Sequence, residues 1–292
     1  MRVLHMFNYK LNDINVGEVA KQGFTHIQIS PMQGMKQEEF IWWCAYQPLG
    51  FKIIDNYFGT KQDLIDLCDR AKKVGIKVVL DVVLNHVAND PYNHLLPHKL
   101  VDKKLIKANI WKENKMVEDY EDRWQVTHWC IGMPSIDTSI KEAQKMIIDF
   151  LLECVSYGVS GFRLDALKHM ATVSEGNDFL IELNKQLPKE VMENSYGEVI
   201  FSSKEILDEY AKYINVLTEG HTTDKNRTVA FIDSHDLYYE FKITQNMSHQ
   251  TLINEYNILT KNFNNTLFFA RPFDNLWKSE EIRKINIGSG DK

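Results

Sequence analysis

The sequence predicts an α/β protein built on a (β/α)8 TIM barrel with a short inserted subdomain. Eight short runs rich in β-branched and aromatic residues alternate with segments of helical periodicity, which is typical of a parallel sheet. The chain has 292 residues, and barrels of this kind commonly need roughly 250. Two domains of about 150 residues each are the alternative that length alone leaves open.

The eight runs have the number and spacing of the strands of a closed barrel. They cover residues 3–8, 25–30, 77–83, 161–165, 195–199, 214–217, 229–233 and 266–270. Between them, apolar residues recur three and four positions apart, which predicts helices over 61–74 and 140–157. In the first of these helices the apolar residues are Leu64, Leu67, Cys68, Ala71 and Val74.

Two stretches depart from this rhythm. Residues 88–137 show no strand–helix alternation, so we expect a small inserted subdomain there, with the barrel formed by 1–87 and 138–292. Only eleven residues separate Leu217 from Val229, whereas a crossover between parallel strands usually needs about a dozen or more. Either one barrel helix is absent or one of the two strands is wrongly assigned. Residues 275–287 are the only candidate for a last barrel helix.

Composition narrows the class of protein. The chain is 44% hydrophobic and 25% charged with a net charge of −6, which suits an enzyme and disfavours nucleic-acid binding. No apolar run approaches the ~20 residues of a membrane span, and no secretory leader is visible, so we expect a cytoplasmic protein. We also expect it to be a monomer. Four reduced thiols are expected, because no spacing suggests pairing or metal binding: Cys44, Cys68, Cys130 and Cys154.

Three acidic residues close three different predicted strands. Asp165 ends the run Gly-Phe-Arg-Leu-Asp, where Arg163 lies two positions earlier and so on the same face. Glu198 ends a second run, and Asp236 follows His235 just after a third. The carboxyl ends of barrel strands share one face, where barrel active sites lie. Each acid would also suit the N-cap of a following helix, but three together favour catalysis.

Paired carboxyl groups are what the cleavage of a glycosidic bond requires. One protonates the leaving oxygen, and a second attacks the anomeric carbon or activates water. A neighbouring guanidinium keeps a carboxylate such as Asp165 ionised. After the second strand lie Trp42, Trp43 and Tyr46, whose rings suit the faces of sugars, and Gln47, which can bind hydroxyl groups. A loop packed on its own aromatic residues is the structural alternative.

With these residues in place, the chain resembles the α-amylases of glycoside hydrolase family 13 over roughly residues 3–272. Five motifs stand in the family's order. They are Trp-Trp-Cys-Ala-Tyr-Gln-Pro at 42–48, Asp-Val-Val-Leu-Asn-His at 81–86, Gly-Phe-Arg-Leu-Asp-Ala-Leu-Lys-His at 161–169, Gly-Glu-Val at 197–199 and Phe-Ile-Asp-Ser-His-Asp at 231–236.

The resemblance implies a retaining hydrolase that cleaves internal α-1,4-glucosidic bonds of starch- or glycogen-type glucans or maltooligosaccharides. Asp165 would be the nucleophile, Glu198 the general acid and base, and Asp236 the stabiliser of the transition state. His86 and His235, with Tyr46 and Arg163, would line the subsite of the glucose whose bond breaks. Lys168 and His169 would contact the leaving chain.

The resemblance also implies ions and a further domain. A calcium ion would bind Asn85 and the carbonyl of His169, although Ser135 stands where the family has an aspartate and carboxylates are the ligands that calcium prefers. A chloride ion would bind Arg163 and Arg271, with Ser234 in place of an asparagine. Members of the family usually carry a β-sandwich domain after the barrel, and the 56 residues after Asp236 are too few to form one. We therefore expect a shortened form that lacks this domain and one barrel helix.

Two other functions stay open at this stage. The same carboxylates would support glucosyl transfer, with a sugar hydroxyl replacing water. The alternative outside the enzymes is a barrel that binds glucan without cleaving it. The presence of all three acids and both histidines argues against this alternative, because binding alone does not require them.

Overall fold

The computed structural model describes residues 1–37 and 41–288, and eight of its strands form a closed parallel barrel. Around the barrel the order is β1-β10-β9-β8-β7-β6-β3-β2. Each strand overlaps one of the eight predicted runs, so the predicted fold class is confirmed. The strands are β1 (Arg2–Met6), β2 (His26–Ile29), β3 (Lys77–Val82), β6 (Gly161–Leu164), β7 (Tyr196–Glu198), β8 (Asn215–Thr218), β9 (Thr228–Phe231) and β10 (Asn265–Phe269).

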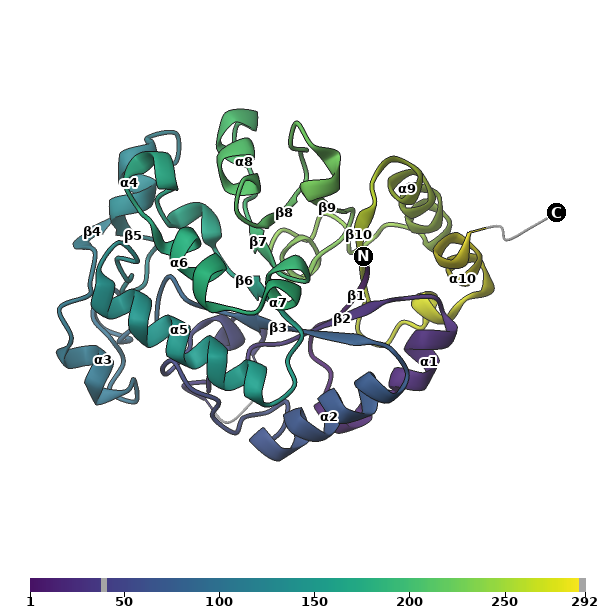
Figure 1. Cartoon of the computed structure of the whole chain (residues 1–292), viewed down its shortest axis with the longest axis horizontal. Helices are drawn as coiled ribbons and strands as arrows, with labels where there is room; N and C mark the ends of the chain where they lie inside the picture. The colour runs from purple at the N-terminus through teal and green to yellow at the C-terminus, as the bar shows by residue number, and fades with distance from the viewer. Residues whose placement is uncertain (38–40, 289–292) are drawn as a thin grey trace.

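Helices surround the barrel on its outer side (Figure 1). The helix α2 shows how the sequence encodes them: Thr60 and Asp63 form a reciprocal capping box at its start. It buries Leu64, Leu67, Cys68 and Ala71, four of the five residues of the predicted apolar stripe. The outer helices are α1 (Val16–Lys21), α2 (Lys61–Lys73), α5 (Lys141–Ser156), α6 (Phe179–Gln186), α7 (Lys189–Glu193), α8 (Lys204–Ala211), α9 (His249–Asn262) and α10 (Glu280–Ile287).

The crossover from β8 to β9 contains no α-helix. Only the short 3-10 turn η5 (Lys225–Arg227) lies between the two strands, and both strands pair as neighbours in the barrel. The first of the two alternatives drawn from the short spacing is therefore correct: the strands are real and the helix is missing. Arg227 holds the crossover to α8, because its Nε donates to the carbonyl of Ala211 at 2.8 Å.

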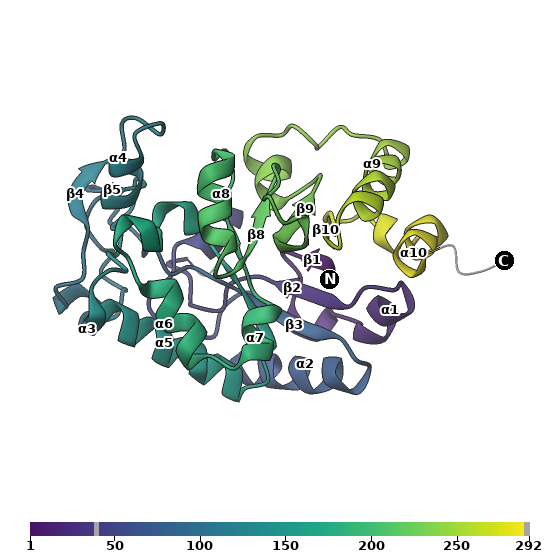
Figure 2. The same cartoon turned by 45° about the horizontal axis from the view of Figure 1, so that its top comes forward.

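Between β3 and α5 the chain forms a small unit at the end of the molecule opposite α9 and α10 (Figures 1 and 2). It contains α3 (Lys103–Lys107), β4 (Glu113–Met116), α4 (Arg123–His128) and β5 (Trp129–Cys130), and β4 pairs with β5. An apolar cluster that includes Val101, Leu105 and Ile110 lies beneath it and joins Ala143 of α5. That 88 and 137 bound an independent subdomain stays a prediction.

The barrel interior is layered, and the layering positions the site. One buried layer is apolar and comprises Val3, Val79, Tyr196, Leu217, Val229 and Leu267. Towards the carboxyl ends of the strands the buried side chains become polar, with His5, Gln28, Asp81 and Arg163. All four cysteines are buried and free. Among the described residues, no helix combines the length and apolar character that crossing a membrane requires.

Candidate active site

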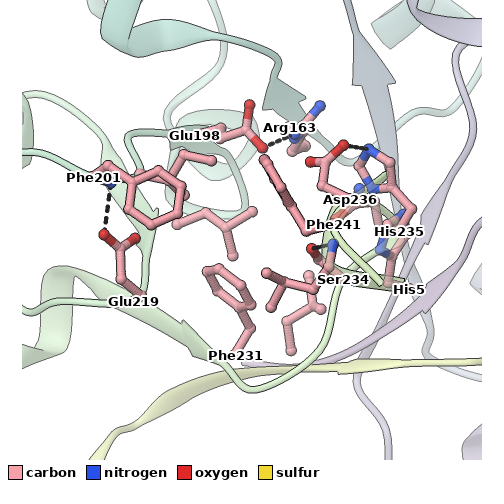
Figure 3. Close-up of a pocket in the computed structure, with 15 residues that line it drawn as sticks. His5, Arg163, Glu198, Phe201, Glu219, Phe231, Ser234, His235, Asp236 and Phe241 are labelled. Atoms are coloured by element: carbon pink, nitrogen blue, oxygen red, sulfur yellow. Dashed lines mark hydrogen bonds and ion pairs between the residues drawn. The ribbon is translucent and has the colours of Figure 1, made fainter. Parts of the chain in front are cut away.

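Arg163, on β6, lies at the centre of the site and is only 1% exposed. Its Nη1 lies 2.6 Å from Asp165 Oδ1 and 2.9 Å from Asp81 Oδ1. Its Nη2 donates to Glu198 Oε1, a contact that Figure 3 shows. Because these acids come from β3, β6 and β7, one guanidinium joins carboxyl groups from three adjacent strands.

Asp165 follows β6 directly and is buried. Its backbone amide donates to the carbonyl of Val82 at 3.0 Å, which fixes the residue at the strand end. Two forces act on its pKa in opposite directions: burial raises it, and the ion pair with Arg163 opposes the rise. The sequence alone suggested only the second of these effects. The net effect is a raised pKa, and the guanidinium at 2.6 Å is the contact that favours the ionised form of Asp165.

Glu198 is the last residue of β7, and its environment suits a proton donor. Its Oε2 accepts a hydrogen bond from the amide of Ala166 at 3.2 Å, and Ala166 adopts a left-handed conformation (φ 50°) immediately after Asp165. Gly197 leaves room for Leu167 beside it: a Cβ there would lie 2.0 Å from Leu167 Cδ2 and 3.0 Å from Leu167 Cβ, so that side chain would have to move. Burial raises the pKa of Glu198, and Asp165 raises it further against the opposition of Arg163.

Asp236 lies beyond β9, as the first residue of the π-helical turn η6 (Asp236–Glu240). Its side chain is 26% exposed, and Oδ1 lies 3.3 Å from His235 Nε2. Burial, followed by the nearby Glu198, holds the pKa of Asp236 well above its usual range. Asp236 and Glu198 line the same pocket, together with Arg163. The structure thus brings all three predicted carboxyl groups together.

A fourth acid, Asp81, belongs to the cluster and was absent from the predicted site. It is fully buried and accepts hydrogen bonds from Arg163, from Tyr46 Oη at 2.9 Å and from Gln28 Nε2 at 3.1 Å. Burial raises its pKa to about 7. Its position as the first residue of the 81–86 motif was the available signal. Four carboxyl groups around one guanidinium cannot all be charged cheaply, so the cluster retains protons near neutral pH.

Tyr46 and two histidines form one wall of the site. The rings of Tyr46 and His235 are stacked, with centroids 4.7 Å apart. His86 Nε2 lies 2.9 Å from the carbonyl of Tyr46. Burial lowers the pKa of His86 to about 4 and that of His235 well below its usual range, so both rings are neutral. Trp42 continues this wall, at 6.2 Å from His235 and stacked on Tyr239 at 6.0 Å.

Trp43 takes a different direction from Trp42. It is 36% exposed and lines an open groove with Gln47, Asn89, His94 and His98, where Lys36 lies over its ring at 5.3 Å. The four residues predicted from the 42–47 loop are therefore divided. Tyr46 contacts Asp81, Trp42 packs near the ring of His235, and Trp43 and Gln47 line the groove.

An apolar pocket opens beside Glu198 and Asp236 (Figure 3). The rings of Phe201, Phe231 and Phe241 line it. Phe201 is fixed from two sides, because its amide donates to Glu219 Oε1 at 2.6 Å and its carbonyl accepts from Lys168 Nζ at 3.1 Å. Of this group only Lys168 was predicted. Phe231 is the first residue of the 231–236 motif, which was the available signal for it, whereas Phe201 and Phe241 belong to no motif and no periodic pattern.

The predicted calcium ligands have a different partner. Lys112 Nζ donates to Asn85 Oδ1 at 2.9 Å and to the carbonyl of His169 at 2.5 Å. Among the described residues, no group of three or more His, Cys, Asp or Glu side chains is arranged to hold a metal. The residues present therefore do not fit a calcium ion. The ring of His169 is buried, with Nδ1 3.1 Å from the carbonyl of Val126, so it packs on the inserted segment and not in the pocket.

The predicted chloride ligands do not fit an anion either. Arg271 is neutralised by Asp233, whose Oδ2 lies 2.6 Å from its Nε, and it also donates to the carbonyls of Thr244 and Met247. The other proposed ligand, Arg163, is paired with three acids. The motif residue Asp233, directly before Ser234, supplies the negative charge that the chloride would have supplied.

Comparison with known proteins agrees with this geometry. The model of the alpha-amylase catalytic domain matches residues 18–281. An alpha-amylase of Clostridium acetobutylicum is 29% identical over 97% of this chain and 42% of its own length. One from Aeromonas hydrophila is 28% identical over 74% of this chain and 50% of its length. The chain thus spans half or less of these curated relatives.

Solved structures share the fold. The alpha-amylase of Geobacillus thermoleovorans, solved with acarbose, superposes with a TM-score of 0.73 at 19% identity, over 98% of this chain and 77% of that one. The gamma-CGTase of Bacillus clarkii gives a TM-score of 0.70 at 19% identity, over 94% of this chain and 49% of that one. With the family model covering most of its length, the chain belongs to the alpha-amylase family of glycoside hydrolases and carries the family's catalytic domain.

Proposed function

We propose that the chain hydrolyses internal α-1,4-glucosidic bonds of starch- or glycogen-type glucans with retention of configuration. The observation that carries this proposal is the sharing of Arg163: Asp165 and Glu198 bind the two terminal nitrogens of one guanidinium. Two carboxyl groups held this close suit the retaining reaction, which needs a separation of about 5–5.5 Å.

In the proposed reaction Asp165 attacks the anomeric carbon while Glu198 gives its proton to the departing glycosidic oxygen. The raised pKa of Glu198 supports the proton-donor role. Asp165 shares Arg163 with Glu198 and also has a raised pKa, so its nucleophile role follows from its position in the 161–169 motif. The covalent glucosyl ester is then cleaved by water, whose proton returns to Glu198. Asp236, at the edge of the pocket, would bind the sugar ring as positive charge develops on it.

The wall of Tyr46, His235 and Trp42 suits the glucose whose bond breaks, because neutral rings pack on sugar faces and neutral imidazoles exchange hydrogen bonds with hydroxyls. In this wall and the adjoining His86, two imidazole nitrogens are buried without a hydrogen-bond partner in the described structure: Nδ1 of His86 and Nδ1 of His235. Unsatisfied buried polar atoms are costly, and sugar hydroxyls are partners of the right size. Trp43 and Gln47 would bind glucose units further along the chain.

The test is the release of reducing ends from soluble starch by the purified chain. We expect activity in the wild type, and a loss of at least about a thousandfold in Asp165→Asn and Glu198→Gln with glucan binding retained. Asp149→Asn, on the exposed face of α5, is the matched control and should keep full activity. Activity in Glu198→Gln close to that of the wild type would refute the assignment.

Glucosyl transfer is a second candidate, favoured by the aromatic lining beside Glu198. A pocket lined by Phe201, Phe231 and Phe241 disfavours water and would favour a sugar as acceptor. Chromatography of the products from a single maltooligosaccharide separates the two, because only transfer yields chains longer than the substrate. That the chain acts as a cytoplasmic monomer stays a prediction.

A further inference from the structure

The junction between the barrel and the inserted segment contains a buried lysine. Lys112 is 8% exposed and lies in the inserted segment just before β4. Its Nζ reaches two oxygens on the barrel: Asn85 Oδ1 at 2.9 Å, just beyond β3, and the carbonyl of His169 at 2.5 Å, on the loop after β6. These are the two oxygens that the family resemblance assigned to calcium.

A calcium ion and this lysine cannot occupy the junction together. Calcium binds oxygens at about 2.3–2.6 Å, so an ion on these two atoms would lie where Nζ lies. Ser135, which stands at the family's aspartate position, does not compensate, because its hydroxyl donates to the carbonyl of Met133 at 2.9 Å. In the part of the chain that the structure describes, no carboxylate oxygen lies within 4.0 Å of Lys112 Nζ.

The backbone of Lys112 is held as firmly as its side chain. Its amide donates to the carbonyl of Ser135 at 2.9 Å, and the neighbouring Trp111 bridges Ile136. Burial lowers the pKa of Lys112 to about 7. An ammonium and an amine can both donate two hydrogen bonds, so the two contacts to Asn85 and His169 do not depend on the protonation state.

A second cation of the inserted segment acts on the same loop. Arg123, on α4, donates through Nη1 to the carbonyl of Lys168 and through Nη2 to that of Met170 at 3.2 Å. Glu175 accepts from two of its nitrogens, at 2.7 and 2.9 Å. The backbone carbonyls of three successive residues therefore accept hydrogen bonds from the inserted segment: those of Lys168 and Met170 from Arg123, and that of His169 from Lys112. This loop begins three residues after Asp165.

We propose that the Lys112 amino group permanently replaces the calcium ion in this chain, and that Lys112 and Arg123 together fix the loop after Asp165 to the inserted segment. The protein then needs no metal to hold the junction, and its stability is independent of calcium. Neither part of this inference rests on the proposed hydrolysis of glucans.

The first test is the thermal unfolding of the wild-type chain, followed by circular dichroism, after treatment with EDTA and again in millimolar calcium. We expect the midpoint to change by about 1 °C or less, and calorimetric titration with calcium to give no binding heat. A saturable calcium site that raises the midpoint would overturn the proposal. This measurement needs no variant and so holds even if variants of Lys112 fold poorly.

The second test compares Lys112→Met with Lys107→Met, an exposed lysine of α3 in the same segment. Removing Lys112 leaves two buried oxygens without donors, so we expect its midpoint to fall by about 5–10 °C while that of Lys107→Met stays at the wild-type value. If Lys112→Met unfolds at the wild-type temperature, the lysine does not hold the junction.

Discussion

Replacing Arg163 by methionine would remove the only cation that forms an ion pair with Asp81, Asp165 or Glu198 in the described structure. In the wild type this guanidinium binds Asp81, Asp165 and Glu198, whose side chains are between 0% and 14% exposed. Breaking a buried ion pair by removing one partner costs about 3–5 kcal/mol. The midpoint of thermal unfolding should therefore fall by roughly 6–15 °C near neutral pH.

This loss should depend on pH with a definite sign. Burial already raises the folded-state pKa of Asp81 to about 7, and removing Arg163 raises the carboxyl pKa values further. A group with a raised folded pKa stabilises the protein below its unfolded pKa, and that stabilisation disappears as pH rises through the folded pKa. The difference between wild type and Arg163→Met should therefore be small at about pH 5 and large at about pH 8.

Thermal unfolding followed by circular dichroism at both pH values is the assay. Arg283→Met provides the control, because Arg283 forms an exposed pair with Glu280 that is worth at most about 1 kcal/mol. If Arg163→Met unfolds within about 2 °C of the wild type at the higher pH, or loses the same stability at both pH values, Arg163 is not the counter-charge of the cluster.

Three further predictions concern substrate, pH and ions. Trp43→Ala should raise KM for long maltooligosaccharides roughly three- to tenfold and leave kcat unchanged, as steady-state kinetics would show; an equal effect on short substrates would contradict a role of the groove. The alkaline limb of kcat/KM should lie above the ordinary carboxyl value of 4.5, because burial raises the pKa of Glu198, and a limb at 4.5 or below would oppose its role as acid. Replacing chloride by acetate should leave the rate unchanged, because Asp233 neutralises Arg271; activation by chloride would count against this.

The sequence could predict those features that depend on residues close together in the chain. Strand alternation located all eight barrel strands, and the two-residue spacing of Arg163 and Asp165 placed their side chains on one face. The short spacing before Val229 indicated either a missing helix or a wrongly assigned strand, and the structure shows that the helix is missing. In each case the information lies within a dozen residues, where backbone geometry alone relates sequence to position.

What the sequence could not predict depends on contacts between distant segments. Lys112 is 27 residues from Asn85 and 57 from His169, and nothing in its local sequence marks it as buried. The pair of Arg271 and Asp233 spans 38 residues. Burial had a similar effect on Asp165, where desolvation opposes the ion pair that the sequence suggested. Such features follow from packing and not from spacing.

The pairing of β1 with β10 also bears on how the barrel can form. Leu4 pairs with Phe268 in the closed barrel, so closure joins two segments that lie far apart in the sequence. Until β10 has emerged from the ribosome, β1 and β9 each present an unpaired edge, which is a site for wrong association. Contacts of such long range also slow folding. Closure of the barrel therefore depends on the pairing of the five-residue strand β10 with both edges.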